Sequence, residues 1–275
     1  MKKYKRIWSG NWKILIGIGI LVLVLILGIW GLVQNQKGNG SDFKIGIVAD
    51  DGVELVSISP DRKMINILDI DPETKLWIVG GLGWYRSSVI KKVLLQEKKM
   101  PLSKQIFFYN FGFVPDKILM VKNKDDWKKV YWLRYRLVES KMLIKKEYVK
   151  GDITLQDDFL NEIMVRDFAE TDIVKQEIKM SIFNLSEMNG LAGFVAKRFE
   201  WMGGQVVTVE NISDESFEKC LVKYGSGISR KSASWLLVDS LSDCDKVVDN
   251  SLGDNEIEYY VDDSFGLGVN YPSYK

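Results

Sequence analysis

The feature that most constrains the fold is a run of 20 residues, Ile14 to Val33, that contains no charged side chain. A helix of that length, at about 1.5 Å per residue, spans the roughly 30 Å hydrocarbon core of a bilayer. Trp12 and Trp30 lie near the two ends of the run, where indole rings favour the membrane interface. The sequence therefore predicts one transmembrane helix over residues 14–33.

The alternative for this segment is a cleaved signal peptide, whose apolar region is shorter and ends at a small-x-small site. Here the apolar run is longer, and its exit is Trp30-Gly-Leu-Val-Gln-Asn, so we favour an uncleaved anchor. Residues 1–13 carry five cations and no acidic group, which keeps this basic tail in the cytoplasm by the positive-inside rule. We expect a single-pass protein of the cell membrane, with a polar linker at 34–41 and the bulk of the chain extracytoplasmic.

Composition excludes several classes of function. The chain has no histidine, which rules out a histidine base and His-ligated metals, and its two cysteines rule out a four-thiolate site. Lysine and arginine total 38 against 37 acidic residues, so a uniformly basic nucleic-acid binder is not expected. The last part of the chain, 175–275, is acidic, with 10 basic and 16 acidic residues.

The region 42–174 is predicted to be a mixed α/β domain. Short Ile- and Val-rich runs separated by Asp-Asp-Gly and Ser-Pro-Asp-Arg turns indicate a meander of strands. Strands are predicted at 43–48, 53–58, 63–70, 76–79, 105–109 and 117–121, a glycine turn at 80–83, and helices at 84–98, 125–141 and 155–168.

The region 175–266 is predicted to be a small two-layer α/β domain with the order β-α-β-β-α-β-β, followed by a tail at 267–275. Alternating apolar residues indicate strands, and apolar residues at helical spacing before Gly203-Gly204 indicate a helix with a left-handed stop. Strands are predicted at 177–183, 205–210, 218–224, 246–248 and 256–261, and helices at 190–202 and 226–241.

Three short motifs mark the first region: Asp51 opens a strand, Ser57-Ile58-Ser59-Pro60 forms a turn, and Asp71-Pro72-Glu73-Thr74 follows the next strand. This arrangement resembles the catalytic domain of the LytR-CpsA-Psr family, which attaches lipid-linked anionic glycopolymers to the bacterial cell wall. The family's catalytic Pro-Arg-Asp-Thr corresponds to residues 71–74, so Pro72 stands where the family has its arginine. The downstream Arg-rich motif of the family is not recognisable.

The loss of this arginine has a chemical consequence, because phosphoryl transfer depends on cations that neutralise the moving charge. Asp51 and Glu73 are the remaining candidate catalytic carboxylates, and together they could hold Mg²⁺ if the domain is active. The alternative is that Asp50 and Asp51 lie in a solvated turn. We therefore expect a non-catalytic relative without a cofactor or metal, and Mg²⁺ only if the alternative of an active transferase holds.

A second motif opens the region 175–266, where Phe183-Asn184-Leu185-Ser186 leads to Gly190-Leu191-Ala192 and then a helix. This motif resembles the LytR C-terminal domain, with Leu185 in place of the usual glycine. The resemblance implies a role in binding or positioning at the envelope rather than in catalysis.

Four residues of this loop, Asn184, Ser186, Asn189 and Gly190, are candidate ligand-binding groups. They precede a helix N-terminus, whose free N–H groups suit a carboxylate or sugar hydroxyls. The alternative is that Asn189 or Ser186 caps the helix. Cys220 and Cys244 lie in strands expected to be neighbours, and they form either a disulfide or two buried thiols.

The function that we expect is that of a membrane-anchored cell-envelope protein that binds or scaffolds in cell-wall glycopolymer attachment. Its expected partners are the membrane and either peptidoglycan or another envelope protein, and not nucleic acid. An active phosphotransferase that moves a lipid-linked glycopolymer to peptidoglycan is the alternative, and a regulatory partner of another membrane enzyme is a third class.

The predicted topology can be tested with a protease added to cells whose wall is permeable and whose membrane is sealed. We expect the protease to digest the chain beyond Gln34 and to leave only the anchor, because five cations hold the N-terminus inside. A cytoplasmic protein detected in the same blot controls for membrane leakage. Full protection of the large region would contradict the topology.

Overall fold

The structure is a computed structural model, and it describes residues 42–78, 82–130, 142–151, 158–212, 220–240 and 244–262. By its internal contacts the chain divides into two units, residues 1–40 and 41–275. The predicted basic tail, transmembrane segment 14–33, linker 34–41 and C-terminal tail lie outside the described residues. Within the described ranges, no helix has the length and apolar character needed to cross a membrane.

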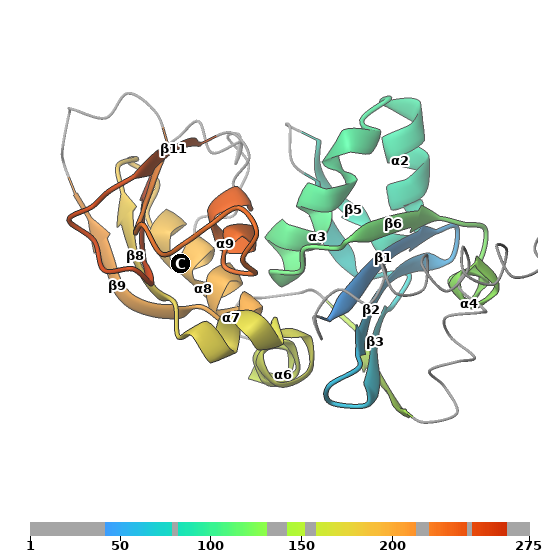
Figure 1. Cartoon of the computed structure of the whole chain (residues 1–275). Helices are drawn as coiled ribbons and strands as arrows, with labels where there is room; N and C mark the ends of the chain where they lie inside the picture. Colours follow the sequence, from blue (N-terminus) through green and yellow to red (C-terminus); the bar gives the residue numbers. More distant parts are fainter. Residues whose placement is uncertain are drawn as a thin grey trace, which may run out of the picture. The chain divides into compact units, whose positions relative to one another are not determined.

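The first half of the described chain contains a five-stranded sheet in the order β6-β1-β2-β3-β7 (Figure 1). β1, β2 and β3 pair antiparallel, so the predicted meander is confirmed, whereas β6 and β7 run parallel to their neighbours β1 and β3. A separate hairpin is formed by β4 and β5. The bounds are Phe43–Ala49 (β1), Gly52–Ser59 (β2), Met64–Ile70 (β3), Lys75–Ile78 (β4), Gly83–Arg86 (β5), Lys117–Met120 (β6) and Leu143–Val149 (β7).

The central strands β1, β2 and β3 are buried on both faces of the sheet, and every residue of β2 is buried. One face, with Val53 and Leu55, packs with side chains of the helices α2 (Ile90–Gln96) and α3 (Ser103–Phe111). The other face, with Ile47 and Val56, forms a second cluster with Trp127 of α4 (Asp126–Val130).

Two predicted elements of this half are wrong in type. Residues 105–109, predicted as a strand, lie in α3, where every residue from Ile106 to Phe111 is buried. Because a short apolar run has no polar face, its periodicity does not separate a buried strand from a buried helix. The helix predicted from Trp84 begins only at Ile90, since residues 84–86 belong to β5 and Trp84 pairs with Trp77.

Several short elements complete the first half. β7 and α7 were not predicted, and the helix predicted at 155–168 is described from residue 158 as α6 followed by the π-helical segment η3. The bounds are Ser87–Val89 (η1), Met100–Leu102 (η2), Asp158–Ile163 (α6), Met164–Phe168 (η3) and Thr171–Gln176 (α7).

The second half contains another five-stranded sheet, in the order β11-β10-β12-β8-β9. Its elements follow the chain order β-α-β-β-α-β-β (Figure 1). Side chains of α8 and α9 form one apolar cluster with the sheet. The chain is thus a mixed α and β protein, as predicted. The bounds are Lys179–Asn184 (β8), Leu191–Met202 (α8), Gln205–Asn211 (β9), Leu221–Tyr224 (β10), Trp235–Asp239 (α9), Asp245–Val248 (β11) and Glu256–Val261 (β12).

The helix predicted at 226–241 is much shorter, because α9 covers only residues 235–239. The preceding segment is rich in serine, and its hydroxyls form local hydrogen bonds instead of leaving the backbone to a helix. Ser226 Oγ donates to Asp254 at 3.0 Å, and Ser232 Oγ donates to the carbonyl of Ser229 at 2.6 Å.

Residues of both halves contribute to two of the three apolar clusters. Phe108 and Tyr109 of α3 belong to the same buried cluster as the inner face of the second sheet. Tyr109 stacks on Phe194 of α8, with ring centroids 6.4 Å apart, and the Arg198 Nε donates to the Tyr109 carbonyl at 2.8 Å. All three apolar clusters are built from residues of 41–275, so this unit contains its own cores.

Gly112, which ends α3, is a point of close approach between the two halves. Its φ is +56°, and a Cβ at this position would lie 2.5 Å from the carbonyl oxygen of Arg198. We expect Gly112→Ala to lower the free energy of unfolding by more than about 2 kcal/mol, because it combines a strained φ with a backbone clash. Urea unfolding of the 41–275 unit measures this loss.

Gly193→Ala is the matched control, since Gly193 lies within α8 and a Cβ there meets nothing within 4 Å. The control should leave stability unchanged or raise it by up to about 1 kcal/mol, because alanine is the better helix former. Equal effects of the two substitutions would contradict the close contact.

Candidate functional site

A cluster of charged side chains lies where β2 begins and β3 ends. Glu54 of β2 and Asp69 of β3 stand directly opposite each other, an arrangement that repels unless cations intervene. Lys146 of β7 supplies one cation, with its Nζ 3.0 Å from Asp69 Oδ2 and 3.7 Å from Glu54 Oε2. Lys124, from the loop after β6, forms an ion pair with the other oxygen of Asp69. We call Asp51, Glu54, Asp69, Lys124 and Lys146 the lysine–carboxylate cluster.

Lys124 joins this cluster to the turn between β1 and β2. Its backbone N–H donates to Asp51 Oδ1 at 3.0 Å, and its Nζ also donates to the carbonyl of Ile70 at 3.3 Å. Gly52 in the turn has a φ of +130°, and a Cβ there would lie 3.4 Å from the Lys124 Nζ. The turn needs glycine for this backbone conformation.

Glu54 is the most buried acid of the cluster. It is 2% exposed, and Trp127 Nε1 donates a hydrogen bond to its Oε1 at 2.9 Å. Burial raises the pKa of Glu54 from 4.5 to about 7, and the charge of Asp69 adds to this rise while Lys146 and the Trp127 hydrogen bond oppose it. Glu54 therefore changes its charge near neutral pH.

The two carboxylates that the sequence singled out have separate partners. Asp51 lies in an exposed turn and binds the Lys124 N–H, whereas the exposed Glu73 forms a 3.0 Å ion pair with Arg86. Pro72 accepts a hydrogen bond from Ser88 through its carbonyl, at 2.9 Å. Over the described ranges, no group of three or more His, Cys, Asp or Glu residues could hold a metal ion.

Sequence reasoning missed the other members of the cluster, Glu54, Asp69, Lys124 and Lys146. The signal that could have found two of them is a carboxylate inside an apolar strand, as in GVELVSIS and MINILDI. Such a group is nearly always paired when it is buried. The lysine partners come from segments 55 and 77 positions further along than Asp69, and no local pattern marks them.

The loop that opens the second half is held together by Asn184, which is 2% exposed. Its Nδ2 donates to the Met188 carbonyl at 3.0 Å and to Asn211 Oδ1 at 2.9 Å. Its Oδ1 accepts hydrogen bonds from the N–H and the hydroxyl of Ser186, at 3.0 and 2.8 Å. Asn184 and Ser186 therefore bond within the loop and to the neighbouring strand.

The start of α8 differs from the expected capping arrangement. Gly190 is the N-cap residue, with φ of +83°, and Ser186 Oγ accepts a hydrogen bond from the Met188 N–H at 3.1 Å instead of capping the helix. In the part of the chain that the structure describes, no side chain caps this helix. Of the four predicted ligand residues, Asn189 and Gly190 are the exposed ones.

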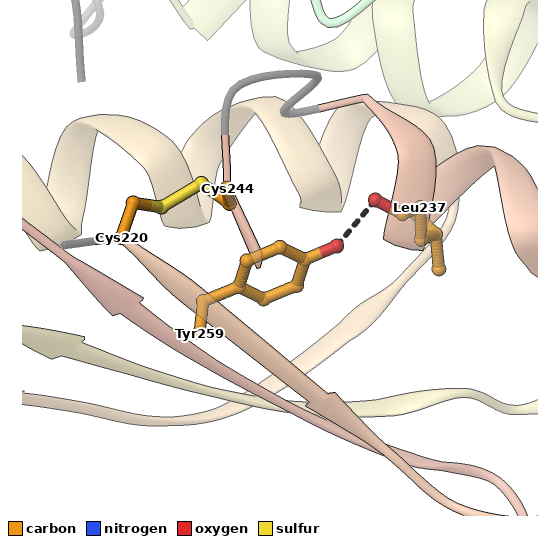
Figure 2. The surroundings of a disulfide bond; sticks show 4 residues. All are labelled: Cys220, Leu237, Cys244 and Tyr259. Atoms are coloured by element: carbon orange, nitrogen blue, oxygen red, sulfur yellow. Dashed lines mark hydrogen bonds between the residues drawn. A yellow bond between two sulfur atoms is a disulfide. The ribbon is translucent and has the colours of Figure 1, made fainter. Parts of the chain in front are cut away.

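Cys220 and Cys244 are bonded to each other in the structure (Figure 2). They immediately precede β10 and β11, which pair in parallel with Leu221 opposite Asp245. Their Cα atoms are 4.6 Å apart, and both residues are buried. Beside them, the buried Tyr259 hydroxyl donates to the Leu237 carbonyl and joins β12 to α9 (Figure 2).

Comparison with known proteins gives little. No family model and no curated protein matches the sequence. A solved structure described as "LytR-CPS2A-psr family protein YwtF (TagT) with bound octaprenyl pyrophosphate lipid" matches with 12% identity and a TM-score of 0.25, over 62% of this chain and 77% of that one. That solved structure is described as a member of the family that residues 42–174 of this sequence resemble.

The raised pKa of Glu54 makes stability depend on pH. The unfolded side chain loses its proton near pH 4.5, whereas the folded one keeps it until about pH 7. The free energy of unfolding should therefore fall as pH rises through this window, by on the order of 3 kcal/mol from this group. Denaturant titration of the 41–275 unit between pH 4.5 and 8 measures the loss.

Glu54→Gln should remove this part of the pH dependence, because glutamine still accepts the Trp127 hydrogen bond and cannot ionise. The variant is then more stable than the natural chain above pH 7. Glu187→Gln, at an exposed loop position, is the control and should keep the original slope. The same slope in all three proteins would refute the titration of Glu54.

Proposed function

We propose that the chain is a membrane-anchored, extracytoplasmic protein of the bacterial cell envelope that binds or positions cell-wall components without transferring glycopolymer. Residues 14–33 are the anchor in this proposal, and the unit 41–275 carries the binding surfaces. The region 175–266 has the role of a LytR C-terminal domain.

The observation that carries the location is the Cys220–Cys244 disulfide. Structural disulfides persist in oxidising compartments and are rare in the cytosol of most organisms. The charge asymmetry around the predicted span points the same way, because the five cations all precede it. Two independent features therefore support an extracytoplasmic unit.

The state of the candidate carboxylates supports a non-catalytic role. Asp51 is bound by the Lys124 backbone, Glu73 is paired with Arg86 at the surface, and Pro72 occupies the position of the family's arginine. An acid that holds Mg²⁺ for phosphoryl transfer must face the metal together with phosphate oxygens. Asp51 and Glu73 instead bind separate protein groups.

One observation favours the alternative of an active transferase. Lys124 and Lys146 bring two ammonium groups to the end of β3, close to the segment 71–74. Cations at this place could take over the charge neutralisation that the missing arginine would supply. Both lysines are paired with Asp69, however, which reduces the positive charge available to a phosphate group.

The ligands that fit the second half best are the uncharged sugars of peptidoglycan or a protein partner. This half is acidic, so it repels strongly anionic polymers. The exposed Asn189 and the uncapped start of α8 offer an amide and free N–H groups to sugar hydroxyls.

The proposal predicts retention on cell wall without turnover. The 41–275 unit should sediment with insoluble peptidoglycan, and Asn189→Ala should lower the bound fraction several-fold by removing one amide contact. Glu187→Ala, in the same loop, is the matched control. When the unit is incubated with a polyprenyl-pyrophosphate-linked glycan, peptidoglycan and Mg²⁺, no glycan transfer is expected.

Glycan transfer that Asp51→Ala abolishes would replace the proposal by the transferase alternative. Absence of wall retention, with the fold intact by circular dichroism, would remove peptidoglycan as the ligand. Both assays use the whole unit because the two halves share one core.

A further inference from the structure

The surface of α2 and the turn that follows it combines exposed apolar groups with lysines. Leu95 and Met100 are 52% and 39% exposed, and Lys92, Lys98 and Lys104 are exposed around them in the sequence. We call these five residues the α2 surface, although Lys104 lies in the first turn of α3.

The backbone explains why these side chains are exposed. α2 buries Ile90 and Leu94 against the first sheet, so Lys92 and Leu95 lie on the other side of the helix. The turn after α2 contains Lys98, which has a φ of +53°. Its N–H donates a hydrogen bond to the Leu95 carbonyl at 3.3 Å. The exposure of Leu95 therefore follows from its position on the helix, and a backbone hydrogen bond closes the turn that follows.

The charge of this surface is largely uncompensated. Within the described ranges, no ion pair engages Lys92, Lys98 or Lys104, in contrast to Lys91, whose Nζ lies 2.9 Å from Asp50 Oδ1. Five lysines and one acid, Glu97, occur between residues 87 and 104. The partner that complements such a surface is anionic and offers an apolar layer beneath its charges.

A bilayer containing anionic phospholipids has this chemistry. Lysines next to a membrane gain electrostatic attraction to anionic headgroups, and apolar side chains gain by entering the boundary between headgroups and acyl chains. The predicted linker 34–41 extends to at most about 30 Å, so the anchor would keep the folded unit close to the bilayer. The α2 surface and the membrane anchor with its short linker are separate features, and both favour the membrane as the partner.

We propose that the α2 surface docks on the anionic phospholipids of the membrane that holds the 14–33 anchor. This inference rests on the proposed membrane anchoring for its location, but the binding itself resides in the unit 41–275. Leu95 and Met100 enter the interface, and Lys92, Lys98 and Lys104 bind the headgroups. Docking would fix the orientation of the unit and present its other surfaces to the cell wall.

The test is sedimentation of the 41–275 unit, which lacks the anchor, with two kinds of vesicle. We expect binding to vesicles of phosphatidylglycerol and phosphatidylcholine, and much weaker binding to pure phosphatidylcholine. Lys92→Gln with Lys98→Gln should weaken the partition about thirty-fold, at roughly 1 kcal/mol per lysine. Leu95→Ser with Met100→Ser should also weaken it, because the apolar contribution is lost.

Lys179→Gln with Lys231→Gln is the matched control, since both lysines are exposed in the second half. These substitutions should leave the partition unchanged, and circular dichroism verifies the fold of every variant. The proposal is overturned if the unit binds neither vesicle, if it binds both equally, or if the control pair weakens binding as much as the α2 pair.

The outcome separates this inference from the proposed function. Vesicle binding does not depend on the anchor or on its orientation, so protease protection in cells would refute the topology while leaving the measured partition intact. Conversely, loss of vesicle binding would remove the α2 surface as a docking site and leave the topology and the wall assay unaffected.

Discussion

The packing of α3 against α8 is the interaction on which the rest of the structure depends. At Gly112 the two backbones approach so closely that no side chain fits, and around this point Phe108 and Tyr109 enter the core of the second half. Burial of aromatic side chains is the largest apolar contribution available to a chain of this kind. The contact therefore makes one cooperative unit of two sheets that would otherwise each need a complete core.

Because the core is shared, the regions 42–174 and 175–266 are not two independently folded domains. A catalytic-type domain and a C-terminal domain suggest independent modules, yet neither half buries its apolar surface alone. Polar contacts also join the halves, since the Glu170 N–H, next to α7, donates to the Met202 carbonyl of α8 at 3.0 Å, and Trp201 Nε1 donates to Asn161 Oδ1 at 3.0 Å. Separation of the halves would leave these hydrogen-bonding groups without their partners, which costs free energy where they are buried.

Charge has a different role at each part of the unit. In the lysine–carboxylate cluster, cations and acids neutralise one another around a buried glutamate. On the α2 surface lysines remain exposed, and in the second half acids predominate. The net charge of the whole chain is near zero, with 38 basic and 37 acidic residues. The charges are nevertheless distributed unevenly, into a paired interior cluster, a cationic surface and an acidic half, which suit different partners.

The sequence by itself determined those elements whose pattern is local. The meander of β1, β2 and β3 follows from Ile- and Val-rich runs separated by turns such as Asp-Asp-Gly, and α8 follows from its apolar spacing and the Gly203-Gly204 stop. The candidate site could be predicted only in part from the sequence. Asp51 is recognisable from the turn in which it lies, whereas its partner Lys124 is 73 residues away. Such a pairing has no local signature.

Tertiary structure decided the remainder. Residues 105–109 form a helix because both halves surround them, and an all-apolar run has no polar face to reveal its period. Likewise, the pairing of β10 with β11 brings Cys220 and Cys244 within bonding reach across 24 positions. Contacts between distant segments form only when the whole chain is folded, because they gain their energy from burial that no segment achieves alone.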